Sequence, residues 1–239
     1  MLTDTMLASL ATRLQTTTLN IRREYVQHLF LSYLYQQPET DHIYFKGGTA
    51  LRMLYHSPRF SEDLDFSSSV RSIRVIEAAI LETLAAMTRE NLVVDLDESK
   101  ETTGGYLAIV KCRMGETTVT LQIEISLRER ALTGEAVTIV SDFVPAYLVV
   151  ALAKERLISE KMRALTSRKK ARDFYDLYFI LRANLLPARS HTVLAAALQV
   201  LRESKIDFEK ELKEFLPKSH WAIIRDFPAS LEREIERFL

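Results

Sequence analysis

The spacing of hydrophobic residues predicts helices at the start of the chain. Residues 2–15 and 18–37 are expected to form two helices. In the second of them, apolar side chains recur at the i, i+3, i+4, i+7 spacing of an amphipathic helix. Its four repeating apolar positions are Val26, Leu29, Phe30 and Tyr33. The chain therefore opens with at least one helix that has a face suited to packing on a core.

Shorter segments with strand-like patterns follow. A strand is expected at 42–46, then a turn of two glycines and a short helix through Leu51 and Leu54. The next expected elements are a strand at 62–66, a helix at 69–90 and strands at 92–97, 105–113 and 117–127. The last strand has the clearest alternation, which predicts one face on a core and one facing solvent or a cleft. The inward positions are Val119, Leu121, Ile123, Ile125 and Leu127, and the outward positions are Thr118, Thr120, Gln122, Glu124 and Ser126.

The glycines divide the chain into two regions. All 6 glycines lie at or before Gly134, and the sequence beyond that residue is expected to be helical with short breaks. We place a boundary near Pro145, which gives a first domain of 1–145 and a helical second domain of 146–239. The predicted fold class is α+β, with a mixed sheet and flanking helices followed by a C-terminal helical region.

Composition narrows the classes of function. The 239 residues include 32 basic and 32 acidic side chains, so the net charge is zero, and any anion-binding surface must be a local patch. The single cysteine, Cys112, excludes a disulfide within the chain and favours a reducing compartment. No stretch has the length and apolar character of a transmembrane helix, and the first residues lack the pattern of a signal peptide. A cytoplasmic location without membrane contact is expected.

The segment "YFKGGTALRMLYHSPRFSEDLDF" carries the first candidate chemistry. Gly47 and Gly48 follow a predicted strand, and Thr49 is expected to be the N-cap of the next helix. Glycines allow backbone amides to approach an anion closely, and a helix start favours negative charge. This turn is therefore a candidate phosphate-binding site.

Two aspartates lie in the strand that follows. Residues two apart share a face of a strand, so Asp63 and Asp65 are expected to project together with Leu64 and Phe66 behind them. Paired carboxylates suit a hard divalent cation, most simply Mg²⁺ or else Mn²⁺. Glu124 is the candidate third carboxylate and general base, provided that its strand pairs beside 62–66. Ser61, just before the aspartates, is a further candidate for binding the metal or phosphate.

A second candidate region lies at 154–182. Ile158, Met162 and Leu165 form an apolar stripe that leaves Lys161 at its border, where its long side chain could reach phosphate oxygens. The segment from Lys154 to Arg172 contains eight basic residues and two acidic ones. This local excess of positive charge could bind a triphosphate or an RNA backbone, or it could belong to a solvated helix. Asp173 and Asp176 could equally form exposed i,i+4 ion pairs with Lys169 and Arg172.

Both regions match one family. The stretch "GGT" followed by "DLD" resembles the first signature of the DNA polymerase beta nucleotidyltransferase superfamily. More narrowly, "FKGGTALRMLYHSPRFSEDLDFS" and "ERLISEKMRALTSRKKARDFYDLYFI" resemble the AbiEii/AbiGii toxins of type IV toxin–antitoxin systems, to which the MenT toxins belong. The resemblance covers most of residues 20–182. It implies a polymerase-beta-like core and the transfer of a nucleotide from an NTP to an acceptor, with tRNA expected as acceptor and a cognate antitoxin protein as partner.

The resemblance also implies roles for individual residues. Lys161 would hold the nucleotide phosphates, Asp176 would orient that lysine or contact the nucleotide, and Arg168 would supply a second phosphate contact. The third acid is Glu124 where many superfamily members have aspartate, and its longer side chain changes the geometry of a general base or metal ligand. Two alternatives stay open: a transferase acting on a protein or small molecule, and a nucleotide-binding module without turnover.

Overall fold

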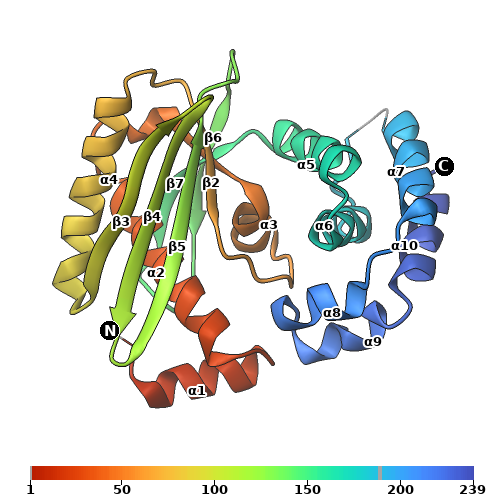
Figure 1. Cartoon of the computed structure of the whole chain (residues 1–239), viewed down its shortest axis with the longest axis horizontal. Coiled ribbons are helices and arrows are strands. Elements are labelled where there is room, and N and C mark those ends of the chain that lie inside the picture. Colours follow the sequence, from red (N-terminus) through yellow and green to blue (C-terminus); the bar gives the residue numbers. More distant parts are fainter. Residues whose placement is uncertain (1, 188–189) are drawn as a thin grey trace. The chain divides into compact units, whose positions relative to one another are not determined.

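The protein forms two compact units. The computed structural model describes residues 2–187 and 190–239. The first unit comprises Met1–His56 with Phe60–Ala153, and the second comprises Ser57–Arg59 with Lys154–Leu239 (Figure 1). The short segment Ser57–Arg59 thus belongs to the second unit although both of its flanks belong to the first.

The first unit is built on a mixed seven-stranded sheet with the order β3-β4-β5-β2-β1-β7-β6. Its strands are β1 (Ile43–Lys46), β2 (Leu64–Ser68), β3 (Val93–Thr102), β4 (Gly105–Met114), β5 (Thr117–Ser126), β6 (Gly134–Ile139) and β7 (Tyr147–Leu152). β1 and β2 are antiparallel, whereas β2 pairs with β5 and β1 with β7 in parallel. The expected alternation of β5 is confirmed, because its apolar positions from Val119 to Ile125 are buried.

Helices flank this sheet. They are α1 (Asp4–Arg13), α2 (Thr18–Leu34), α3 (Gly47–Tyr55) and α4 (Ile73–Met87), with single 3-10 turns at Thr40–His42 and Thr88–Glu90. α2 packs on α4, β5 and β7, and α3 packs on β1 and β2. Figure 1 shows α4 and α3 on opposite sides of the sheet. Thr17 caps α2 by accepting a hydrogen bond from the Asn20 amide at 3.2 Å.

The second unit is helical. Its α-helices are α5 (Lys154–Arg168), α6 (Ala171–Arg182), α7 (His191–Glu203), α8 (Phe208–Leu212), α9 (Trp221–Ile224) and α10 (Phe227–Glu236). Two 3-10 turns lie at Lys213–Phe215 and Lys218–His220. α6 packs against α5, α8 and α10, with the rings of Phe208 and Phe227 4.9 Å apart between their centroids. Among the described residues, no helix has both the length and the hydropathy needed to cross a bilayer.

The predicted class is confirmed: a mixed sheet with flanking helices is followed by a helical region. The expectation of helix throughout the sequence after Gly134 was wrong, because β6 and β7 form a hairpin that extends the sheet. Its sequences "GEAVTI" and "YLVVAL" are rich in β-branched residues, which favour strands. The change from sheet to helix falls after Ala153, and residues 146–153 lie in the first unit.

Candidate active site

The glycine turn lies against one of the two aspartates. α3 begins at Gly47, directly after β1, and Gly47 has φ +86°, a conformation that L side chains rarely adopt. A Cβ atom at this residue would lie 2.0 Å from Asp65 Oδ2. Glycine is therefore required at this position for two reasons: the backbone conformation and the close approach of the Asp65 carboxylate.

Thr49 has a different role from the one predicted. It lies in the first turn of α3, and the N-cap position is occupied by Lys46, so the expected N-cap role was wrong. The Thr49 side chain is buried, and its hydroxyl donates a hydrogen bond of 2.5 Å to the Asp63 carbonyl oxygen. Thr49 therefore holds the chain at Asp63. The backbone amides of Gly47 and Gly48, in the first turn, lack acceptors within the helix and stay suited to an anion.

Asp63 and Asp65 differ in their backbone setting. β2 begins at Leu64, so Asp63 lies immediately before the strand. The prediction that Asp63 lies within the strand was wrong. Leu64 and Phe66 are fully buried behind the aspartates, as predicted. Asp63 and Asp65 are both half-buried.

Glu124 is the direct neighbour of Asp65. β5 runs parallel to β2 with Asp65 paired to Glu124, which confirms the predicted alignment of these two residues. Paired residues on adjacent strands project to the same side of a sheet, so the two carboxylates share a face. Glu124 is exposed and accepts a hydrogen bond of 2.5 Å from the Gln122 side-chain amide.

Carboxylate oxygens are ligands that suit a hard divalent cation. In the part of the chain that the structure describes, no three or more His, Cys, Asp or Glu side chains form a ready-made cation site. Mg²⁺ commonly binds through one or two carboxylates together with substrate phosphates and water, rather than in a full protein cage. Two adjacent carboxylates, Asp65 and Glu124, fit that manner of binding. The metal role of Asp63, Asp65 and Glu124 stays a prediction.

On β1, the strand that pairs with β2 on the side opposite β5, Asp65 has a lysine as its neighbour. Lys46 is the cross-strand partner of Asp65, and its ammonium lies 3.5 Å from Glu129. Ser126 donates a hydrogen bond of 2.7 Å to the same carboxylate. Burial acts to raise the pKa of Glu129, but this hydrogen bond and the charge of Lys46 outweigh burial and hold the pKa below its ordinary value. Glu129 is therefore ionised at neutral pH.

Helix α2 supports the segment before Asp63, a contribution that the sequence analysis missed. The buried side-chain amide of Gln27 donates hydrogen bonds to the carbonyl oxygens of Ser61 at 2.8 Å and of Glu62 at 3.1 Å. Arg52, which is paired with Glu24 at 2.6 Å, lies over the Phe60 ring at 3.5 Å. Ser61 is therefore fixed through its backbone, and its predicted role toward metal or phosphate is untested. No pattern in the sequence identifies Gln27 as its anchor.

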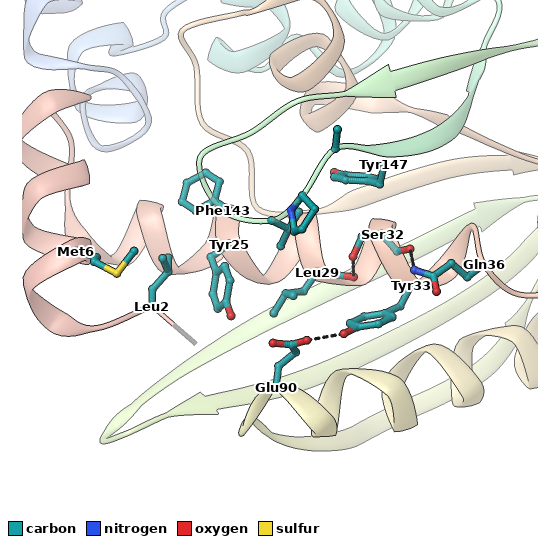
Figure 2. Close-up of a pocket in the computed structure, with 13 residues that line it drawn as sticks. Leu2, Met6, Tyr25, Leu29, Ser32, Tyr33, Gln36, Glu90, Phe143 and Tyr147 are labelled. Atoms are coloured by element: carbon teal, nitrogen blue, oxygen red, sulfur yellow. Dashed lines mark hydrogen bonds between the residues drawn. The ribbon is translucent and has the colours of Figure 1, made fainter.

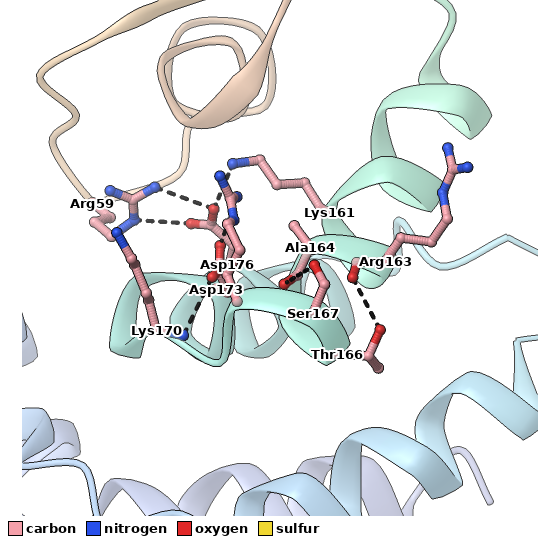
Figure 3. Close-up of polar contacts among 10 residues, drawn as sticks. Arg59, Lys161, Arg163, Ala164, Thr166, Ser167, Lys170, Asp173 and Asp176 are labelled. Atoms are coloured by element: carbon pink, nitrogen blue, oxygen red, sulfur yellow. Dashed lines mark hydrogen bonds and ion pairs between the residues drawn. The ribbon is translucent and has the colours of Figure 1, made fainter. Parts of the chain in front are cut away.

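The second unit contains a buried ion cluster, which we call the Asp176 cluster: Arg59, Lys161 and Asp176 (Figure 3). Arg59 binds both carboxylate oxygens of Asp176, with Nε–Oδ1 and NH2–Oδ2 distances of 2.9 and 3.1 Å. Lys161 Nζ lies 2.8 Å from Asp176 Oδ2. Asp176 is 1% exposed and Arg59 is 4% exposed, so this is not the exposed ion pair considered as an alternative.

The cluster sets the charge state of its members. Burial alone would raise the pKa of Asp176, but the charges of Arg59 and Lys161 outweigh it and lower the pKa to about 2. Two cations and one carboxylate leave one net positive charge. Since Arg59 binds both carboxylate oxygens and is buried, the excess charge is presented by Lys161, whose side chain is 12% exposed.

Arg59 was the main omission of the sequence analysis. It lies between the two halves of the first signature, in "HSPRFSE", and a lone basic residue after a proline there could have been noted as a candidate. Its partner, however, is 117 positions away along the chain. No local pattern predicts a contact of that separation.

Arg168 and Asp173 form a separate pair. The Arg168 guanidinium lies 3.1 Å from Asp173 Oδ1, and Arg168 is 49% exposed at its side chain. Asp173 is buried and accepts a hydrogen bond of 3.4 Å from the Lys170 backbone amide, so it supports the start of α6. The exposed pair with Lys169 that was considered as an alternative is therefore not supported, since Asp173 is buried and paired with Arg168. The predicted phosphate contact of Arg168 is untested.

The glycine turn, the two aspartates and Glu124 lie in the first unit, and the Asp176 cluster lies in the second. Residues 29–238 match the sequence profile of a family described as "Nucleotidyl transferase AbiEii toxin, Type IV TA system". No match was found among curated proteins.

Two solved structures from Helicobacter pylori share the fold. A protein assigned as a nucleotidyltransferase is 19% identical, with a TM-score of 0.55, over 92% of this chain and 97% of its own. JHP933 is 18% identical, with a TM-score of 0.54, over 93% of this chain and 96% of its own. At these identities the two structures bear on the fold alone, whereas the profile covers most of the chain. The chain therefore belongs to the AbiEii nucleotidyl transferase toxin family of type IV toxin–antitoxin systems, and it is a nucleotidyltransferase.

Proposed function

We propose that this nucleotidyltransferase transfers a nucleotide from an NTP to the 3′ end of tRNA in a reaction that requires Mg²⁺ or Mn²⁺. The observation that carries this proposal is the alignment of Asp65 with Glu124 on neighbouring parallel strands, beside the glycine turn whose Gly47 touches the Asp65 carboxylate. A phosphate-binding turn next to paired carboxylates suits a nucleoside triphosphate. The tRNA acceptor follows from the family resemblance and the exposed basic residues of α5.

In the proposed reaction a terminal ribose hydroxyl attacks the α-phosphorus of the NTP. A new oxygen–phosphorus bond forms, the bond to the bridging oxygen of the β-phosphate breaks, and pyrophosphate leaves with its electron pair. Glu124 accepts the proton of the attacking hydroxyl, because it is the accessible carboxylate beside Asp65. Asp63 and Asp65 would hold the divalent cation, which would supply charge neutralisation at the phosphate oxygens.

The other residues bind and orient. The backbone amides of Gly47 and Gly48 hold phosphate oxygens, and Thr49 keeps Asp63 in place through the 2.5 Å hydrogen bond to its carbonyl. The family resemblance gives Lys161 the role of binding nucleotide phosphates, and its ammonium is held by Asp176, whose charge Arg59 offsets. The cellular role that follows is that of a toxin that blocks translation and is neutralised by a cognate antitoxin protein.

The experiment is a transfer assay with purified protein. Each of the four α-labelled NTPs is incubated with total tRNA and Mg²⁺, and label in tRNA and released pyrophosphate are measured together. We expect one or more NTPs to label tRNA at its 3′ end, with equal pyrophosphate release and loss of both on chelation. Asp63→Ala and Asp65→Asn should reduce transfer by about a thousand-fold or more, since removal of groups acting in the transition state costs several powers of ten.

The control variant is Asp97→Asn, which changes an exposed aspartate on β3 and should retain full activity. Label on protein or small molecules instead of tRNA would overturn the acceptor assignment. NTP binding without pyrophosphate release would contradict the proposal that the protein is a catalytic transferase. Undiminished transfer by Asp63→Ala would contradict the assignment of the active site.

A further inference from the structure

A cavity in the first unit lies apart from the glycine turn and its carboxylates. It has a volume of about 460 Å³ and lies beside α2, between the 3-10 turn Thr88–Glu90 and the segment that leads into β7. We call it the Tyr25–Glu90 cavity, after two of the residues that line it. Neither the proposed reaction nor its phosphate-binding turn uses any of its side chains.

Aromatic rings form much of its wall. Tyr25 and Tyr33 project from α2, and Phe143 and Tyr147 come from the segment before and at the start of β7 (Figure 2). The ring centroids of Tyr25 and Phe143 are 6.3 Å apart. The Tyr147 hydroxyl is held by His28 Nδ1 at 2.7 Å, which fixes that ring. Aromatic faces carry negative quadrupole potential and attract cations within about 6 Å of the ring.

One carboxylate lies in this aromatic setting. Glu90 accepts a hydrogen bond of 2.5 Å from the Tyr33 hydroxyl and is half-buried. Within the described residues 2–187 and 190–239, Glu90 forms no ion pair with an arginine, lysine or histidine. Its exposed sequence neighbour Arg89 does not form one with it either. Charges in partly buried settings are commonly paired with an opposite charge, and a cation bound in the cavity would supply that partner for Glu90.

The hydroxyl of a largely buried tyrosine adds a second polar group. Tyr25 is only 2% exposed, lines the cavity, and makes no hydrogen bond through its hydroxyl to any residue in the described part of the chain. Burial raises the pKa of Tyr25 to about 12, and the negative charge of Glu90 adds to that rise. The hydroxyl therefore stays neutral, and its oxygen is available to accept a hydrogen bond.

We propose that the Tyr25–Glu90 cavity binds an alkylguanidinium or alkylammonium cation. The Glu90 carboxylate and the Tyr25 hydroxyl oxygen accept hydrogen bonds from the cationic head, and the aromatic rings and Leu29 surround its apolar stem. Such a head belongs either to a free organic amine or to the arginine or lysine side chain of another protein. The cavity is a binding site separate from nucleotide transfer, and its occupancy does not depend on that activity.

Binding can be measured with a matched pair of probes. Butylguanidinium and butylurea have nearly the same shape and differ in charge. Isothermal titration calorimetry of the full chain with each compound therefore isolates the contribution of charge to the binding free energy. We expect butylguanidinium to bind at least about ten-fold more tightly than butylurea, the effect of about 1.4 kcal/mol of charge-dependent interaction. The peptide acetyl-Gly-Arg-Gly-amide distinguishes the sources: binding comparable to that of butylguanidinium identifies a protein side chain, and much weaker binding identifies a free cation.

Two variants test whether butylguanidinium binds in the cavity. Glu90→Gln should weaken butylguanidinium binding about ten-fold, and Tyr25→Phe should weaken it by a smaller factor because only one hydrogen bond is lost. Glu82→Gln, on the exposed side of α4, is the matched control and should bind as the unchanged protein does. Far-ultraviolet circular dichroism checks that each variant folds. Equal affinities for the two probes, no binding of butylguanidinium, or full binding by both Glu90→Gln and Tyr25→Phe would overturn the proposal.

Discussion

At the scale of single residues, Gly47 shows why the first signature needs its glycine. Its positive φ and its contact with Asp65 are separate constraints, and the chain provides a control that has only one of them. Gly115, in the turn between β4 and β5, has φ +61° with no neighbouring atom within 4 Å of a Cβ at that position. Alanine at the two positions therefore separates backbone strain from displacement of the carboxylate.

We predict that Gly47→Ala abolishes nucleotide transfer and lowers the free energy of unfolding by about 2–4 kcal/mol, because strain and the clash with Asp65 add. Gly115→Ala should cost only about 1–2 kcal/mol and leave transfer intact, because strain acts alone. Urea unfolding and the labelled-NTP assay measure the two effects. Equal losses of activity in both variants would contradict the role given to the Asp65 contact.

Asp176 gives a prediction about pH. Its pKa is about 2 in the folded protein and about 3.9 in an unfolded chain, so folding favours the ionised form. The resulting stabilisation, on the order of 2 kcal/mol, is present above about pH 4 and is lost as the pH falls toward 2. The stability difference between the unchanged protein and Asp176→Asn should shrink by that amount between about pH 6 and pH 2. Asp142→Asn, at an exposed pair with Arg13, is the control and should show little change.

Arg59 is the residue whose importance the structure revealed. We predict that Arg59→Met destabilises the protein by about 3–5 kcal/mol, because it leaves Asp176 buried with Lys161 as its remaining partner in the cluster. Where the variant folds, its KM for NTP should rise, because Asp176 then cancels the charge of Lys161. Arg59→Lys should restore part of both properties by keeping the charge without the two-point contact. An unchanged KM in a folded Arg59→Met would argue against this coupling.

At the scale of secondary-structure elements, α2 holds the segment that leads into the aspartates. Gln27 reaches two successive carbonyl oxygens there, those of Ser61 and Glu62. We predict that Gln27→Leu lowers the free energy of unfolding by about 1–3 kcal/mol, since two carbonyls in a partly buried setting lose their donor. It should also slow transfer by about ten-fold or more through misplacement of Asp63.

The control for this prediction lies just beyond the end of the same helix. Gln36 is exposed near the end of α2, where its side-chain amide binds the Ser32 carbonyl at 2.7 Å. Gln36→Leu should leave both stability and transfer nearly unchanged. If Gln27→Leu is equally silent in a urea titration and in single-turnover transfer, then α2 does not position the aspartates.

At the scale of the whole molecule, a net charge of zero limits how tRNA can be held. Within the basic segment 154–172, Lys161 and Arg168 are engaged by Asp176 and Asp173. Lys169 and Lys170 are exposed and are the better candidates for contacts with the RNA backbone. A protein of this composition is expected to bind RNA through few contacts rather than over its whole surface.

We predict that Lys169→Glu combined with Lys170→Glu weakens tRNA binding about ten-fold or more and reduces the slope of log affinity against log salt by about 1–2. The exposed pair Lys205 and Lys210, outside this segment, provides a control with the same change of net charge. Fluorescence anisotropy with labelled tRNA at several salt concentrations measures both quantities. Equal losses in the two double variants would mean that overall charge, and not this segment, determines binding.

The sequence predicted more of the fold than of the site. The alternation of β5 and the apolar spacing of α2 predicted these two elements, because periodicity is a local property. The single apolar face expected for α2 was wrong, since the helix is buried on all sides from Glu24 to Leu31. The β6–β7 hairpin was missed because a short apolar run fits either a helix or a strand until its neighbours are known. Thr49 was misassigned as an N-cap because the start of a helix is set by local geometry, here the positive φ of Gly47.

By itself the sequence determined the α+β class, the glycine turn, the pair of aspartates and the family, all of which are carried by residues close together in the chain. The tertiary structure decided which side chains act together: Asp65 with Gly47 and Glu124, Gln27 with the segment before Asp63, and Arg59 with Asp176. The physical reason is separation. Local propensity and periodicity act over a few residues, whereas strand register and a buried ion pair join positions tens to more than a hundred residues apart, and only packing of the complete chain selects them.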